Sequence, residues 1–207
     1  MQLDEIRIEP KVVPAGSDTP CPSAMEYIRS DLYRYTGDTR LVTMLSQLLV
    51  SRAFRYGFWL RLRHSGSAPV RWLAWGVHRH LSNRYGVSIH APRIGYGLYI
   101  GHPVGIVINP TTVIGNNFNI GQLTTIGSNH GRAAEIGDNV YIGPGVCVVE
   151  HVRIGDNSTI GAGAVVVKDV PAGATVAGNP AKVVSMREPG RFVANRWPVT
   201  ESSDFTP

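Results

Sequence analysis

The sequence predicts a mainly β protein, a parallel β-helix that follows a small α-helical cap. The first observation is a six-residue repeat of aliphatic residues between residues 94 and 166, in which glycine follows most of the repeated positions. A period of six fits neither an amphipathic helix nor a two-sided strand, so each unit is interpreted as one short strand and one turn. Three units make a coil of about eighteen residues, stacked at the usual strand spacing of roughly 4.7–4.9 Å. The repeated residues are Ile94, Ile100, Ile106, Ile114, Ile120, Ile126, Ile136, Ile142, Val148, Ile154, Ile160 and Val166.

Two longer steps interrupt this repeat. The step from Ile106 to Ile114 is eight residues, and the step from Ile126 to Ile136 is ten. The second step predicts an extra loop around residues 128–132. Loops on a rigid scaffold often carry binding groups, and a tolerated surface insertion is the alternative.

The second observation is helical periodicity before the repeat. Ser23 and Glu26 form a capping box and Gly37 is a plausible stop, which predicts a helix over residues 24–36. A further helix is expected from about residue 39 to residue 60, weakened near Gly57.

A third helix is expected from Pro69 to about Asn83, with proline in its first turn and Leu73, Val77 and Leu81 along one face. The expected divisions are a flexible arm (1–22), a helical cap (23–86), a β-helix domain (87–184) and a C-terminal tail (185–207).

Composition limits the class of protein. A length of 207 residues with 43% hydrophobic content fits one domain with an appendage, and 23 glycines suit a fold of tight turns. The net charge of +5 agrees with a phosphate-rich ligand, with an anionic membrane, or with an ordinary basic protein. The β-helix region has no dense Lys/Arg stripe, so no nucleic-acid partner is expected. Cys21 and Cys147 suggest neither a disulfide framework nor a metal site, and no signal peptide is apparent, so a cytoplasmic protein is expected.

Residues 52–84 mix aromatic and basic side chains, which allows two interpretations. In one, these helices rest at the inner face of a membrane that carries a lipid-linked substrate. In the other, which is favoured, the aromatic rings pack on the end of the β-helix while the arginine heads stay in water.

Several ordered motifs resemble the hexapeptide-repeat acyltransferases, in particular a serine acetyltransferase-like branch associated with polysaccharide biosynthesis. The resemblance implies a left-handed β-helix and a homotrimer with active sites between subunits. It also implies acetyl-coenzyme A (acetyl-CoA) as co-substrate, and no metal. The motifs are Ser30-Asp-Leu-Tyr-Arg-Tyr-Thr-Gly37, Ile94-Gly-Tyr-Gly-Leu-Tyr-Ile-Gly-His102, Gly105-Ile-Val-Ile-Asn109, Lys168-Asp-Val-Pro171 and Ala177-Gly-Asn-Pro-Ala-Lys182.

The resemblance assigns roles to individual residues. His102 matches the family's general base, and a histidine suits this role because its ordinary pKa lies near 6.5. The expected acceptor-binding residues are Arg132, Asp31, Asp38 and Asn109, with Asp31 and Asp38 as alternatives for one family position. His130 is added because it lies in the inserted loop, and simple exposure to solvent is the alternative for it. The expected coenzyme-binding residues are Gly143, Ala162, Gly163, Lys168 and Lys182.

Departures from the family pattern guide the choice of acceptor. Ser88 stands where the family has the aspartate that orients the base, Gly101 replaces an aspartate that helps hold the amino group of serine, and Ala133 replaces a histidine. The preferred hypothesis is therefore O-acetylation of a hydroxyl on a sugar or polysaccharide precursor, by direct transfer in a ternary complex. The alternatives are a serine O-acetyltransferase of cysteine synthesis and a non-catalytic β-helix scaffold.

Overall fold

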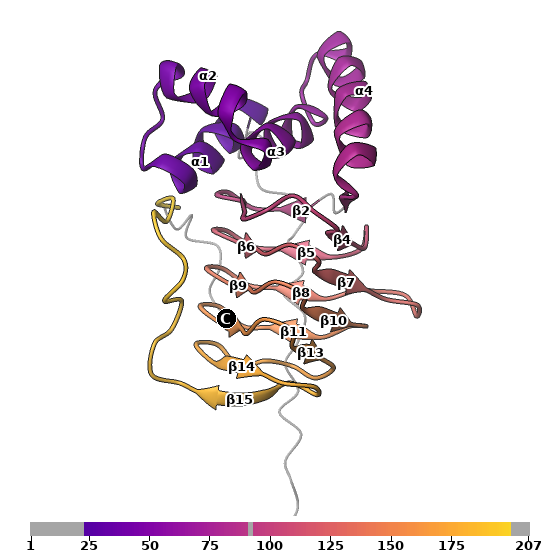
Figure 1. Cartoon of the computed structure of the whole chain (residues 1–207), viewed down its shortest axis with the longest axis vertical. Helices are drawn as coiled ribbons and strands as arrows, with labels where there is room; N and C mark the ends of the chain where they lie inside the picture. Colours follow the sequence, from indigo (N-terminus) through magenta and orange to yellow (C-terminus); the bar gives the residue numbers. More distant parts are fainter. Residues whose placement is uncertain (1–22, 91–92, 200–207) are drawn as a thin grey trace, which may run out of the picture.

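The computed structural model describes residues 23–90 and 93–199. Four helices gather at one end of the molecule, and a stack of coils extends from them (Figure 1). Within the described residues no helix is both long enough and apolar enough to cross a bilayer. The helices are α1 (Ala24–Thr36), α2 (Leu41–Val50), α3 (Arg52–Leu62) and α4 (Ala68–Tyr85).

The coils are built from three parallel sheets, which confirms the predicted β-helix. The chain visits the first, second and third sheets in turn and repeats this cycle for five coils. Among the strands of the described residues, only β15, which pairs antiparallel with β14, leaves the pattern, and it closes the far end. The first sheet contains β1 (Ser88–Ile89), β4 (Val107–Ile108), β7 (Thr125–Gly127), β10 (Cys147–Val149) and β13 (Val165–Val166); the second contains β2 (Arg93–Ile94), β5 (Val113–Ile114), β8 (Glu135–Ile136) and β11 (Arg153–Ile154); the third contains β3 (Tyr99–Ile100), β6 (Asn119–Ile120), β9 (Tyr141–Ile142), β12 (Thr159–Ile160), β14 (Thr175–Ala177) and β15 (Lys182–Ser185).

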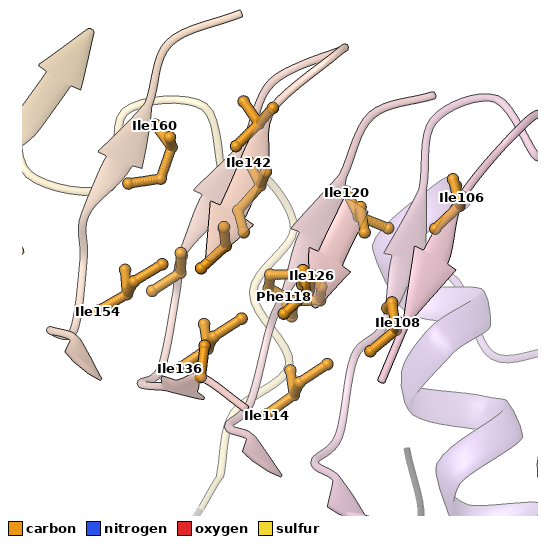
Figure 2. Packing of buried hydrophobic residues seen from close by; sticks show 14 of the residues in the cluster. Ile106, Ile108, Ile114, Phe118, Ile120, Ile126, Ile136, Ile142, Ile154 and Ile160 are labelled. Carbon is orange, nitrogen blue, oxygen red and sulfur yellow. The ribbon is translucent and has the colours of Figure 1, made fainter. Parts of the chain in front are cut away.

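The core of the β-helix is the column of repeated aliphatic side chains. All twelve repeat positions are buried, and Figure 2 shows isoleucines of successive coils projecting into the space between the strands. Each buried side chain of this size contributes about 1.5–3 kcal/mol relative to its exposed state. The six-residue period therefore reflects one core contact per side of the coil.

The strand pairing shows that one of the two longer steps in the repeat lies at a different position from the one predicted. Ile126 pairs with Ile108, so Ile106 fills the turn before the strand. The extra two residues lie between Ile100 and Ile108, not between Ile106 and Ile114 as the sequence suggested. Ile106 misled the count because it is also fully buried.

The predicted helices are confirmed with one important difference. The helix expected over residues 39–60 is two helices, which break at Ser51 instead of weakening at Gly57. Ser51 has extended backbone angles, and its Oγ accepts a hydrogen bond from the Phe54 N–H at 3.1 Å, so it caps α3. In α4, Leu73 is exposed, and the buried face consists of Ala74, His78 and Leu81.

Helix α1 is fixed to the first coil by side-chain contacts with its backbone. Ser30 Oγ accepts from the Gly97 N–H at 2.9 Å, and the Tyr35 hydroxyl bonds both the N–H and the carbonyl of Ile100. The Ser30–Gly37 motif is therefore a docking segment that holds β3 in place.

Residues 187–199 differ from the expected flexible tail because they run along the outside of the β-helix. The Trp197 N–H donates to Asn117 Oδ1 at 2.7 Å, the Phe192 ring packs on Tyr141, and Val193 is buried. The expected arm over residues 1–22 lies outside the described residues, as do residues 200–207 of the expected tail.

The glycines that follow the isoleucines of the second sheet are required by close stacking of the coils. A Cβ on Gly115 would lie 2.8 Å from the carbonyl atoms of Gly137 in the next coil. We expect Gly115→Ala to lower the free energy of unfolding by about 1–3 kcal/mol in denaturant titrations. The matched control is Gly127→Ala, where the nearest atom would lie at 3.8 Å. Equal stability of the two variants would contradict this explanation of the repeat.

Candidate active site

One edge of the three-sided β-helix holds the predicted base and several predicted coenzyme contacts. This edge, here called the histidine edge, consists of the turns that lead from the third sheet to the first, and the backbone hydrogen bonds between these turns stack them in register. His102 lies in its first turn, Gly143 in its third, and Ala162 and Gly163 in its fourth. The turns are residues 101–106, 121–124, 143–146 and 161–164.

The turn that contains His102 is longer than the others on this edge. It carries the two extra residues between Ile100 and Ile108, and its own backbone bond joins the Val104 N–H to the His102 carbonyl at 2.9 Å. The His102 side chain is exposed. Within residues 23–90 and 93–199, no side chain hydrogen-bonds its imidazole.

A cavity of about 350 Å³ opens beside His102. Its other wall is the junction of α2 and α3, so the break at Ser51 brings the start of α3 over the histidine edge. The Ser51 hydroxyl accepts from the Phe54 N–H, but the other N–H groups of the first turn lack intrahelical acceptors, which favours an anion at this position. The lining residues are Val50, Ser51, Arg52, Ala53, Tyr85, Gly101, His102, Pro103 and Val104.

The charge of the cavity is positive. Arg52 is the only arginine or lysine in its lining, and no lining residue is Asp or Glu. The surrounding sequence has the same bias, because residues 39–134 contain ten arginines and no acidic residue. The cavity therefore favours an acceptor that carries a carboxylate.

Arg52 and Tyr85, which line the cavity, were not predicted from the sequence as candidate site residues. The available signal was Ser51 as an N-cap, but Ser51 lacks the acidic partner three residues later that marked Ser23. Gly101 leaves room in the cavity, since a Cβ there would lie 3.6 Å from the nearest atom, the Ile120 carbonyl oxygen.

The predicted coenzyme residues are partly brought together. Gly143 stacks directly on Ala162, and a Cβ on Gly143 would lie 2.8 Å from the Ala162 nitrogen. Gly163 has φ +69°, a conformation that favours glycine. Lys168 and Lys182 are exposed. Lys168 lies off the histidine edge, in the turn after β13, whereas Lys182 begins β15 and pairs with Ala177, which stacks on Gly161 in the fourth turn of that edge.

The predicted acceptor residues Asn109, His130 and Arg132 lie on a second edge, here called the loop edge. It consists of the turns that lead from the first sheet to the second, including the inserted loop at 128–134. Asn109 Nδ2 donates to the Ser128 carbonyl at 3.3 Å, which ties the loop to the coil before it. His130 and Arg132 are exposed.

Glu150 organises the inserted loop. It accepts hydrogen bonds from the Ser128 hydroxyl at 2.8 Å and from the Asn129 N–H at 3.2 Å, and these bonds lower the pKa of Glu150 to about 2. His130 Nδ1 lies 3.3 Å from the same carboxylate. The loop is therefore held by an ionised carboxylate.

The two candidate aspartates lie away from the cavity lining. Asp31 is buried and accepts two hydrogen bonds from Arg61, at 2.8 and 3.0 Å. Asp38 accepts from Thr43 and Arg40, and these hydrogen bonds hold the pKa of the Asp38 carboxyl below its usual range. Both carboxylates have partners within the helical cap.

Ser88 does not reach His102 as an orienting group. Its hydroxyl bonds His90 Nδ1 at 3.1 Å instead. Among residues 23–90 and 93–199, no group of three or more His, Cys, Asp or Glu side chains is arranged to hold a metal ion.

Comparisons with known proteins agree with this geometry. Residues 133–168 match the family model "Bacterial transferase hexapeptide (six repeats)". Serine acetyltransferase 5 of Arabidopsis thaliana is 38% identical over 148 residues, which cover 64% of this chain and 47% of that protein. Serine acetyltransferase of Neisseria gonorrhoeae in complex with serine has a TM-score of 0.62 and 36% identity over 77% of this chain and 68% of that chain. A serine acetyltransferase in complex with CoA has a TM-score of 0.61 and 28% identity over 77% of this chain and 68% of that chain.

The β-helix of hexapeptide coils, the matched family model and the similarity to solved serine acetyltransferases together identify a hexapeptide-repeat acyltransferase. The predicted left-handed β-helix of this class is confirmed. The chain belongs to the serine acetyltransferase type of this family. Its match spans 33% to 55% of the length of eight curated serine acetyltransferases.

The preference for a sugar acceptor is wrong. The relatives and the solved structures are serine acetyltransferases, and nothing in them supports an association with polysaccharide biosynthesis. The preference depended on two lost negative charges. Ser88 stands at the position of the aspartate that orients the base, and Gly101 at the position of the aspartate that helps hold the amino group of serine. The preference did not take into account Arg52, the positively charged residue that lines the cavity beside His102.

Proposed function

We propose that this protein is a serine O-acetyltransferase that uses acetyl-CoA as donor and His102 as general base. The single observation that carries the proposal is the cavity shared by His102 and the start of α3, in a chain of the serine acetyltransferase type. A relative of this type is solved with serine and another with CoA.

The proposed reaction needs one base and no resident metal. His102 removes the proton from the serine hydroxyl as its oxygen attacks the thioester carbonyl carbon of acetyl-CoA. The new C–O bond forms, the C–S bond breaks, and the proton leaves with the thiolate as free CoA. Such a base contributes about 10²–10⁴-fold to the rate.

The acceptor is held mainly by its carboxylate. Arg52 offers a guanidinium that pairs well with a carboxylate, and the N–H groups that begin α3 reinforce it. Since the cavity lining contains no Asp or Glu, the ammonium group of serine contributes less to recognition than its carboxylate.

The proposed active unit is a homotrimer. His102 and Gly143 lie on the histidine edge, whereas Asn109, His130 and Arg132 lie on the loop edge, so one chain does not bring all of them together. The loop edge of a second copy, placed against the histidine edge, would complete the acceptor site. Lys168, also on the loop edge, and Lys182 are then available to the coenzyme phosphates.

The test of the function is an assay of CoA release with serine, in which the product is identified by mass spectrometry. We expect formation of O-acetylserine that requires both substrates. Hydrolysis of acetyl-CoA without an acetylated serine product, or no release at all, would refute the proposal.

Arg52→Gln is expected to raise KM for serine by about 10- to 100-fold, because a hydrogen bond to a charged group contributes about 1.5–3 kcal/mol. KM for acetyl-CoA should stay near its original value. Steady-state kinetics with each substrate varied measure this difference. Arg84→Gln is the matched control, since Arg84 is exposed on α4 and outside the cavity lining. Equal effects of the two substitutions would exclude Arg52 as the carboxylate ligand.

A further inference from the structure

The helical cap has an unusual distribution of charge. Residues 39–86 contain eight arginines, no lysine and no acidic residue. Some of these arginines have structural partners; Arg61 bonds Asp31, and Arg55 donates to the carbonyls of Leu48 and Leu49. The remaining charge is not balanced within this segment, so the cap presents a positive surface.

Helix α4 carries large apolar side chains on its outer face. Ala74, His78 and Leu81 form its buried face, while Trp72, Leu73 and Trp75 are 74%, 60% and 49% exposed. Exposed clusters of large apolar side chains commonly mark an interaction surface. These residues lie in the first turns of α4, which Figure 1 shows at the end of the molecule opposite β15.

Arginines surround these tryptophans. Arg63, Arg71, Trp72 and Trp75 line one hollow of about 470 Å³. The Arg79 guanidinium lies 5.7 Å from the centre of the Trp75 ring. Tryptophan combined with arginine on one face of a helix is typical of segments that bind at the lipid–water interface.

The same observations disfavour a second copy of the chain as the occupant. In a two-fold contact the same surface would face itself, and its arginines would repel one another with no carboxylate from residues 39–134 to compensate. An anionic bilayer supplies both the negative charge and an apolar layer for the rings.

We propose that the outer face of α4, defined by Arg71, Trp72, Leu73, Trp75 and Arg79 and here called the α4 surface, adsorbs to anionic lipid bilayers. The two interpretations of the aromatic residues in 52–84 then apply to different helices: packing inside the protein applies to α3, and contact with a membrane applies to α4. The rings of α3, such as Phe54 and Tyr56, are buried in the protein, whereas the tryptophans of α4 are available to lipid.

The test is flotation of the full chain with vesicles of phosphatidylcholine containing phosphatidylglycerol, compared with pure phosphatidylcholine. We expect binding only to the anionic vesicles, weakened by salt. Arg71→Gln with Arg79→Gln should lower the partition coefficient about fivefold per residue, because each cation near such a surface contributes about that factor. The charge-matched control, Arg187→Gln with Arg191→Gln, should leave binding unchanged.

Trp72→Ala with Trp75→Ala should lower binding about tenfold or more. Val183→Ala with Val184→Ala, at exposed positions of β15, is the apolar control. Absent binding, equal binding to pure phosphatidylcholine, or equal effects of the α4 and control variants would overturn the proposal. Suppose instead that the original protein does not bind vesicles and that light scattering shows a smaller assembly for the Trp72/Trp75 variant than for the original protein. The α4 surface would then be a contact with a second copy of the chain. Acetyl transfer without vesicles should be unchanged in the α4 variants, so this outcome is independent of the proposed activity.

Discussion

His102→Ala is expected to lower kcat for acetyl transfer to serine by about 10²–10⁴-fold, because it removes the group that accepts the hydroxyl proton. The side chain is exposed and no described side chain hydrogen-bonds it, so its loss should leave the fold unchanged. KM for serine should change less than kcat, since Arg52 remains to hold the carboxylate. Initial rates of CoA release, with circular dichroism as the check of folding, measure both effects.

The control for His102→Ala is His80→Ala, which removes an exposed imidazole from α4. His80 lies outside the cavity lining and on neither edge of the β-helix. This variant should retain the original kcat. If His102→Ala also retained it, either another base would serve the reaction or the β-helix would act as a non-catalytic scaffold.

Asp31→Asn is expected to lower the free energy of unfolding by about 3–5 kcal/mol, because it leaves the buried Arg61 without its partner. The Asp31 side chain is 3% exposed, and burial raises its pKa while the charge of Arg61 opposes that rise. The same carboxylate accepts from the Leu98 N–H at 2.7 Å, and Arg61 donates to the carbonyls of Ile94 and Gly95, both at 2.7 Å. One ion pair therefore joins α1 and α3 to the first coil.

Thermal unfolding measures this effect, and a loss of this size corresponds to a midpoint about 10 °C lower. Asp38→Asn is the control, since the Asp38–Arg40 pair lies at the surface and should leave the midpoint nearly unchanged. An Asp31→Asn protein of original stability but with a raised KM for serine would instead place Asp31 in the acceptor site, as the family resemblance suggested.

The β-helix could be predicted because a core with one aliphatic residue per side of each coil produces a six-residue period in the sequence. Its details were less predictable, because Ile106 is buried like a strand residue and moved the longer turn to the wrong place. The break at Ser51 was also missed, since the apolar residues of α2 and α3 continue across it. The cavity beside His102 depends on that break, so it was not predictable from spacing.

The parts of the candidate site that depend on one residue in a recognisable motif could be predicted. The parts that depend on charged residues far apart in the sequence could not. His102 follows from its flanking motif, and the structure brings it onto one edge with Gly143, Ala162 and Gly163. Asp31 could not be distinguished from an acceptor ligand, because its partner Arg61 lies thirty residues away in the sequence. The prediction of the acceptor was wrong for a related reason. The lost negative charges can be seen in the sequence motifs, whereas the position of Arg52 beside His102 can be seen only in the folded structure.

The central claim is that serine binds between His102 and the start of α3, and a crystal structure of the protein with CoA and serine tests it most directly. We predict a serine hydroxyl within roughly 2.6–3.2 Å of an imidazole nitrogen of His102, with its carboxylate against Arg52 and the coenzyme along the histidine edge. Serine bound at a site remote from His102, or CoA bound away from that edge, would contradict the account.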